Sequence, residues 1–123
     1  MILLGDFFEI VSLETEEGSM NALLEINAGH RIFEGHFPNQ PVVPGVCMMQ
    51  MVKEIVEKVL GKKADLSAAA EMKFLAVIDP TQNNIINATI KYSTEEGKVK
   101  VVASLFKEET IHFRMKGTLT INL

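Results

Sequence analysis

The sequence contains no tryptophan, one tyrosine and one cysteine among its 123 residues. The single cysteine, Cys47, cannot form an internal disulfide or an all-cysteine metal site. No stretch approaches the roughly 20 apolar residues of a membrane-spanning helix. The N-terminus also lacks the basic start and long apolar run of a secretory signal peptide. These absences lead us to expect a cytoplasmic protein without a membrane partner.

Positive charge is not in excess, because 12 Lys and Arg face 16 Asp and Glu for a formal net charge of −4. A chain with this balance has no overall attraction for phosphate backbones, so nucleic acid is not an expected partner. Hydrophobic residues make up 47% of the sequence and charged residues 23%. That composition is typical of globular proteins, and the length suits a single domain over residues 1–123.

Alternation of apolar and polar residues predicts most of the secondary structure. Short polar connections of hairpin length join the last three predicted strands, which favours an antiparallel meander. The first predicted strand also fits a helical turn. The predicted strands cover residues 7–13, 20–26, 66–78, 86–92, 99–105 and 111–123.

One helix is predicted, beginning at Pro44 and ending at Leu60 before Gly61. Its second half is amphipathic, whereas its first half is apolar all round except for Gln50. A single helix with an apolar start, accompanied by five or six antiparallel strands, predicts an α+β fold in which the sheet curls around the helix.

The segment between Gly29 and Gly45 has no hydrophobic period and contains three of the four prolines. Long ordered loops in small domains are often functional. This one carries His36, and histidine is the side chain best suited to exchange protons near neutral pH. A loop histidine is more often structural, however, and needs a geometric partner to act. The candidate partner, Gln50, is also explained as a continuation of the polar face of the helix.

The start of the predicted helix offers a second chemical group. The backbone N–H groups of Gly45 and Val46 precede the first intrahelical hydrogen bonds and lie at the positive end of the helix dipole. They are able to polarise a carbonyl oxygen, although every helix start has this property.

Residues 35–46, with the sequence Gly-His-Phe-Pro-Asn-Gln-Pro-Val-Val-Pro-Gly-Val, closely resemble the signature of the 3-hydroxyacyl-[acyl carrier protein] dehydratases of fatty acid synthesis. Residues 71–80 resemble the strand that follows the helix in that family. The resemblance implies a hotdog fold, in which an antiparallel sheet wraps a central helix. It also implies that two subunits pair and that an acyl tunnel runs along their interface.

The same resemblance assigns roles to residues. His36 matches the catalytic histidine, which removes a C2 proton from the 3-hydroxyacyl thioester. The Gly45 N–H matches the group that holds the thioester carbonyl, and Phe37 and Val46 fall beside the substrate. In these enzymes a carboxylate from the helix of the partner subunit assists the departure of the 3-hydroxyl group as water.

The sequence departs from the family at this carboxylate. Gln50 stands fourteen positions after His36, where the family has Glu or Asp. A neutral amide can orient a hydroxyl group or a water molecule but has no titratable proton to give. One turn later, Glu54 occupies a position where relatives often carry Gln. Glu54 is either an accessory group that reaches the site through water or simply an exposed helix residue, which is the commoner outcome.

The remaining candidates have simpler explanations. His30 is expected at a strand end and His112 on the polar face of a strand, and neither has metal-ligand spacing with another His or Cys. We therefore expect no metal site and no cofactor. Cys47 is expected to be a buried, inert thiol.

Three functions remain open at this stage. The first is a dehydratase of acyl thioesters carried on acyl carrier protein or CoA, with Gln50 as an orienting residue. The second is a hotdog thioesterase in which Gln50 positions water. The third is a catalytically weak or silent subunit that binds acyl chains or pairs with a related chain that supplies the missing carboxylate. We expect a homodimer or a heterodimer with a related hotdog chain. Since acyl carrier protein is acidic, it would need a local basic patch, for which the candidates are Lys62, Lys63, Lys73, Arg114 and Lys116.

Overall fold

The computed structural model describes residues 2–34 and 41–121. These residues form one six-stranded sheet, one long helix and one short 3₁₀ helix. The helices are η1 (Arg31–Phe33) and α1 (Gly45–Leu60). The strands are β1 (Phe8–Glu16), β2 (Ser19–Ile26), β3 (Ala64–Phe74), β4 (Ile85–Glu95), β5 (Lys98–Lys107) and β6 (Thr110–Ile121).

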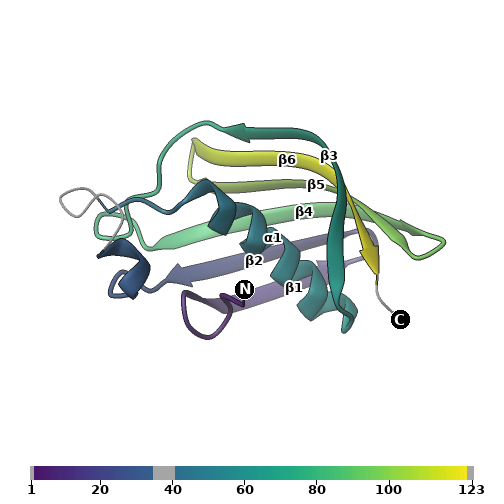
Figure 1. Ribbon diagram of the computed structural model, residues 1–123, viewed down its shortest axis with the longest axis horizontal. Helices are drawn as coiled ribbons and strands as arrows, with labels where there is room; N and C mark the ends of the chain where they lie inside the picture. The colour runs from purple at the N-terminus through teal and green to yellow at the C-terminus, as the bar shows by residue number, and fades with distance from the viewer. Residues whose placement is uncertain (1, 35–40, 122–123) are drawn as a thin grey trace.

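The strands follow the order β1-β2-β4-β5-β6-β3, and every neighbouring pair is antiparallel. Figure 1 shows α1 lying across one face of the sheet, with β3 following it to the far edge beside β6. The meander β4-β5-β6 is therefore confirmed, as is the α+β architecture of a sheet around one helix. The strand β3, which follows the helix in the sequence, is left as an edge strand.

The hydrophobic core lies between α1 and the concave face of the sheet. Met51, Ile55 and Val56 of the helix are completely buried. On the sheet, the inward side chains of β4 and β5 include Ile90 and Leu105, also at 0% exposure. Burial of each such side chain contributes about 1.5 to 3 kcal/mol. This packing holds the helix in a fixed position against the sheet.

The helix α1 ends at the predicted residue and begins one residue later than predicted. The helix begins directly after Pro44, which has extended backbone angles, and it ends at Gly61. Gly61 adopts the left-handed conformation, with φ of 68°, and its N–H donates to the carbonyl of Glu57 at 2.8 Å. Glycine adopts this conformation without steric cost, which explains why the helix stops there.

The prediction for residues 66–78 is wrong in two respects. The strand β3 ends at Phe74, and two irregularities in its pairing with β6, next to Ala68 and Ala69, interrupt the alternation. A β-bulge adds a residue to one strand and so shifts which side chains face the core. As a result Ala68 and Ala70, which the alternation placed on the buried face, are exposed. Ile78, beyond the strand, is completely buried.

The prediction that His112 lies on an exposed polar face is also wrong, because only 5% of this residue is accessible. A register shift between Leu105 and Phe106 of β5 lies opposite this part of β6, and His112 and Phe113 are consecutive buried residues. The Nδ1 atom of His112 lies 3.2 Å from the carbonyl oxygen of Ala76. Among the described residues, its Nε2 atom is buried and has no hydrogen-bond partner.

His30 does not end a strand, since β2 finishes at Ile26. It is instead the N-cap of η1, where its Nδ1 atom accepts from the N–H of Ile32 at 3.0 Å. Its Nε2 atom lies 3.0 Å from Oδ2 of Asp6. His30 therefore has a local structural role within the long segment between β2 and α1.

No helix in residues 2–34 and 41–121 is long and apolar enough to cross a membrane.

Candidate functional site

The first turn of α1 presents the backbone donors expected from the sequence. The intrahelical pattern begins with the N–H of Cys47, which donates to the carbonyl of Pro44 at 2.9 Å. The N–H groups of Gly45 and Val46 therefore precede these bonds, at the positive end of the helix. Val46 is 57% exposed. An acyl carbonyl oxygen placed here would meet both a donor and a favourable dipole.

Phe74, which the sequence analysis did not select, lies directly against this turn. A Cβ atom added to Gly45 would lie 2.7 Å from Cε1 of the Phe74 ring, closer than carbon atoms pack. The absence of a side chain at Gly45 therefore lets the Phe74 ring lie against the helix start. The ring also stacks at a tilt on Phe113, with 5.1 Å between centroids, yet Phe74 is 56% exposed. In the sequence, the only indication of this contact is Gly45, a residue without a side chain at the start of a helix.

The chain on either side of this contact is fixed by the backbone. The N–H of Val43 donates to the carbonyl of Ile78 at 2.9 Å, which ties the segment before α1 to the segment after β3. The N–H of Leu75 donates to the carbonyl of His112 at 2.9 Å. The segment after Phe74 is thus bonded both to the chain that leads into α1 and to β6.

Gln50 and Glu54 form a buried polar pair one helical turn apart. Gln50 is 7% exposed and Glu54 is 5% exposed. The Nε2 atom of Gln50 donates to Oε2 of Glu54 at 2.8 Å. The prediction that this stripe is simply an exposed polar face is wrong for both residues. Glu54 is not exposed because the N-terminal segment covers it.

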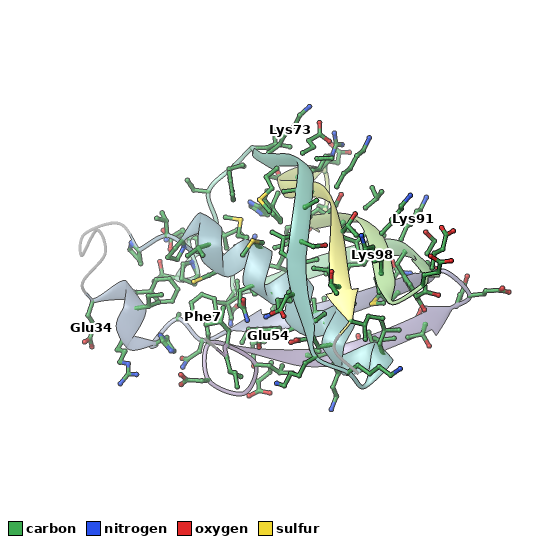
Figure 2. The ribbon with its side chains drawn as sticks, turned by 45° about the vertical axis from the view of Figure 1, so that its right-hand side comes forward. Phe7, Glu34, Glu54, Lys73, Lys91 and Lys98 are labelled. Atoms are coloured by element: carbon green, nitrogen blue, oxygen red, sulfur yellow. The ribbon has the colours of Figure 1, made fainter. Side chains whose placement is uncertain are left out.

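The carboxylate of Glu54 also anchors that segment. Its Oε1 atom accepts from the N–H of Leu3 at 3.0 Å and of Leu4 at 2.6 Å, and its Oε2 atom accepts from Leu3 at 2.8 Å. Figure 2 shows Glu54 on α1, beside the N-terminal part of the chain. A buried carboxylate is tolerated when its oxygens are hydrogen-bonded in this way.

An open hollow of about 520 Å³ lies over this pair. The hollow begins at Gln50 and extends along the C-terminal half of α1 and the turn after it, and Ile2 and Leu4 of the N-terminal segment also line it. Its lining from the helix and the turn comprises Gln50, Lys53, Glu54, Glu57, Lys58, Gly61, Lys62 and Lys63. Ile2 is 70% exposed. The hollow is large enough for part of a small ligand or for a side chain of a second subunit.

Cys47 is buried and follows the helix start by two residues, as expected for a structural thiol. Burial, and to a lesser degree the negative charge of Glu54, raise the pKa of this thiol above 9.0. Because the thiolate is the reactive form, Cys47 is not a nucleophile of this site near neutral pH.

The structure brings some of the predicted site residues together and separates others. His36 and Phe37 lie outside the described residues, so their positions stay predictions. The structure brings Gly45 and Val46 together with Phe74, and it brings Gln50 together with Glu54. His30 and His112 have the separate structural environments given above. The site that can be described is therefore the face of α1 from Gly45 to Glu54.

Comparison with known proteins identifies this architecture. The model of the ApeI-like family, described as ApeI dehydratase, matches residues 12–116. The chain belongs to this dehydratase family. The matched residues contain the motif at residues 35–46, the helix α1 and almost the whole sheet.

Curated relatives agree with this assignment. The 3-hydroxyacyl-[acyl-carrier-protein] dehydratase FabZ of Streptococcus suis is 29% identical over 115 residues, which cover 88% of this chain and 80% of that protein. The FabZ of Lactococcus lactis subsp. cremoris is 25% identical over 120 residues, covering 90% and 80%. The resemblance to the dehydratases is thereby confirmed at the level of the family.

Solved structures share the fold. The dehydratase heterocomplex ApeI:P from Xenorhabdus doucetiae contains a chain with a TM-score of 0.73 and 20% identity, covering 90% of this chain and 96% of that one. The BH2602 protein of Bacillus halodurans, solved with CoA, has a TM-score of 0.58 and 12% identity, covering 92% and 74%. These similarities confirm the hotdog architecture.

Proposed function

We propose that the protein is a hydro-lyase that eliminates water from a 3-hydroxyacyl thioester to give a trans-2-enoyl thioester. The observation that carries this proposal is the buried, hydrogen-bonded amide of Gln50 beneath an open hollow in a chain of the dehydratase family. A polar side chain is buried at such a position only when its hydrogen-bonding groups are used. In relatives with a carboxylate there, that group assists the departure of the hydroxyl.

The proposed reaction begins with His36, which takes the proton from C2. The N–H of Gly45 hydrogen-bonds to the thioester oxygen, where negative charge develops as the proton leaves. The bond between C3 and oxygen then breaks, and its electron pair leaves with the hydroxyl oxygen. Gln50 has no acidic proton, so the imidazolium of His36 protonates the departing hydroxyl to form water. His36 returns to its neutral state, and no cofactor is needed.

We propose that the working unit is a dimer. The edge strand β3 and the residues after it expose apolar side chains, including Phe74 (56%), Leu75 (51%) and Val77 (70%). Exposed edges and contiguous apolar surface favour association with another chain. In this arrangement Gln50 of one subunit and His36 of the other act on the same substrate, as the resemblance to the dehydratases implies. ApeI of Xenorhabdus doucetiae assembles as a heterocomplex, and a related second chain is an alternative partner here.

The substrate carrier is proposed to dock on the outer face of the sheet near Phe74. Lys73 and Arg114 are paired across β3 and β6, next to the pair Phe74 and Phe113. Glu71 forms an ion pair with Lys73 at 3.1 Å, and Lys73, Lys116 and Arg114 together lower the pKa of Glu71. Figure 2 shows Lys73 pointing away from the sheet.

This local excess of cations, in a chain of net charge −4, suits an acidic partner such as acyl carrier protein. The free thiol Cys47 and the thioester chemistry also suit a cytoplasmic location.

The test is to incubate the purified protein with 3-hydroxyacyl thioesters of acyl carrier protein and of CoA and to identify the products by mass spectrometry. We expect an enoyl thioester formed by loss of one water. A free carboxylic acid would instead show a thioesterase, which the water-positioning ability of an amide makes the second candidate. No product from the protein alone, with activity appearing only on addition of a related chain, would show a noncatalytic subunit.

A further inference from the structure

We infer that the hollow beside Gln50 binds a carboxylate at the far end of the acyl chain, and that the ammonium group of Lys53 holds this carboxylate. The substrate class is then a 3-hydroxyacyl thioester whose chain ends in a carboxylate, with Lys53 as a specificity-determining residue. The inference deepens the proposed function and rests on it for the position of the 3-hydroxyl group at Gln50.

The hollow lies where the distal part of such a substrate would go. It begins at Gln50 and continues along the C-terminal half of α1 to Gly61 and the turn after it. In the proposed function the carrier docks near Phe74, so the carrier arm does not occupy this space. The carbons beyond C3 are the part of the substrate that enters the hollow.

The lining of the hollow is mostly cationic and polar. Its apolar side chains are those of Ile2 and Leu4. Four lysines face two glutamates, a formal excess of two positive charges in a chain whose net charge is −4. A plain hydrocarbon chain would meet few apolar partners here, whereas an anionic end would meet charges of the opposite sign. The four lysines are Lys53, Lys58, Lys62 and Lys63.

Both carboxylates of the lining already accept hydrogen bonds from the protein itself. Glu54 is 5% exposed and accepts from the N–H groups of Leu3 and Leu4 and from the amide of Gln50. The Oε2 atom of Glu57 accepts from the backbone N–H of Ala64 at 2.8 Å. Because their oxygens are used in this way, the two glutamates compete weakly for the ammonium groups of the lining.

Lys53 is the lysine of the hollow that lies nearest to Gln50 along the helix. Its side chain is 23% exposed, so most of its surface is covered. Its ion-pair partner within the described residues is Glu57, and the distance from Nζ to Oε2 is 3.9 Å, longer than a hydrogen bond. An ammonium group has three donors, and this contact satisfies none of them. A carboxylate in the hollow would accept charge-assisted hydrogen bonds from these donors.

The spacing of the two residues sets the length of the acyl chain. Residues three apart on a helix, such as Gln50 and Lys53, have Cβ atoms about 5–6 Å apart. A carbon chain advances about 1.2 Å per bond, so a carboxylate about four or five bonds beyond C3 spans this distance. The fitting acyl groups therefore have roughly seven or eight carbons, counted with the terminal carboxylate.

The test compares two ligands that have the same shape and differ in charge. One is the pantetheine amide of 3-hydroxypimelic acid with its free terminal carboxylate, and the other carries a terminal carboxamide instead. Neither is consumed, because an amide makes the C2 proton much less acidic than a thioester does. At neutral pH and low salt, we expect the native protein to bind the carboxylate about tenfold more tightly, the effect of roughly one charged hydrogen bond.

Lys53→Gln should reduce this preference to about threefold or less, because the remaining lysines act only through screened charge. Lys53→Arg retains the charge and the donors, so it should keep most of the native preference. The matched control is Lys91→Gln, which removes the same charge from an exposed position on β4 outside the lining of the hollow. This control should bind both ligands as the native protein does.

Lys53→Met is the second variant if Lys53→Gln folds poorly, since it keeps an unbranched apolar side chain and should also lose the preference. Equal binding of the two ligands by the native protein would overturn the inference. So would a tenfold preference that survives both changes, or an equal loss in Lys91→Gln.

A third ligand distinguishes a carboxylate on the acyl chain from a phosphate on the carrier arm. Adding the 4′-phosphate to the pantetheine of the carboxamide ligand should change the affinities of native protein and Lys53→Gln by the same factor. A gain in affinity from this phosphate that disappears in Lys53→Gln would place the carrier arm in the hollow and overturn the inference.

The two proposals fail in different ways. Enoyl product from plain 3-hydroxyacyl thioesters, together with equal binding of carboxylate and carboxamide, refutes only the role of Lys53. A carboxylate preference that depends on Lys53, without enoyl product from any thioester, refutes only the proposed reaction.

Discussion

The amide nitrogen of Gln50 donates to the carboxylate of Glu54 at 2.8 Å, in a pair that is almost completely buried beneath an open hollow. A glutamine and a glutamate can form a hydrogen bond with each other in either order, because only the direction of donation changes. Exchanging the two residue types would therefore keep this bond while changing the chemistry presented to a substrate.

The exchange gives the first prediction. The double variant Gln50→Glu and Glu54→Gln should increase the rate of dehydration of a short 3-hydroxyacyl thioester by about 10-fold or more, since position 50 then carries a titratable group. Gln at position 54 retains an acceptor for the N–H groups of Leu3 and Leu4. Rates from mass spectrometry of the enoyl product would test this, and an unchanged rate would contradict a missing acid as the limitation.

The single change Gln50→Glu serves as its control. It places two carboxylates in contact in a buried site, so the pKa of one rises and a proton is shared. The free energy of unfolding should fall by about 1 to 3 kcal/mol at neutral pH. A raised folded pKa makes this loss grow as pH rises above about 4.3 and vanish at lower pH. Denaturation at several pH values would reveal it.

The second prediction concerns His36, whose position lies outside the described residues. His36→Ala should lower kcat/KM for dehydration by about 10²- to 10⁴-fold, the usual effect of losing a general base. Thermal unfolding should be checked in parallel. Undiminished turnover by a folded variant would move the base to another residue.

The third prediction concerns His112. His112→Ala should lower the free energy of unfolding by about 1 to 3 kcal/mol, because it removes a buried ring and the contact between Nδ1 and the Ala76 carbonyl. The activity of the folded protein should stay near the native value. Urea denaturation and a kcat/KM measurement would separate the two effects. A large loss of turnover with native stability would contradict this structural role.

The fourth prediction concerns association. The native protein should sediment as a dimer at micromolar concentration, and Val77→Asp should raise its dimer dissociation constant at least about 10-fold by placing a charge in the interface. Val102→Asp is the matched control, since Val102 is 49% exposed on β5 rather than beside β3. Equal effects of both changes, or a native monomer, would contradict the proposed interface.

The fifth prediction concerns the carrier. Arg114→Glu should raise KM for substrates on acyl carrier protein at least about fivefold while leaving KM for pantetheine thioesters nearly unchanged. Lys98→Glu makes the same change of charge on the same sheet, opposite Thr120 and about 20 Å further along β6 from Arg114. Figure 2 shows Lys98 at a distance from Lys73, which lies beside Arg114. A similar rise for both variants would indicate a general charge effect.

The sequence by itself determined the elements whose signals are local. The helix from the residue after Pro44 to Leu60 follows from a proline start, an amphipathic period and a glycine stop. The strands of the meander follow from strict alternation, and the motif around His36 was sufficient to indicate the dehydratase family.

Tertiary structure alone decided the properties that depend on distant segments. Glu54 reads as an exposed helix residue until the backbone of Leu3 and Leu4, about fifty positions away, is placed over it. His112 reads as a polar-face residue until a bulge against β5 turns it inward. Phe74 joins the site because the end of β3 brings its ring against Gly45 at the helix start. The hydrophobic period of a sequence shows which side of its own helix or strand a residue faces. Its burial and hydrogen bonds depend on which other elements pack against that side.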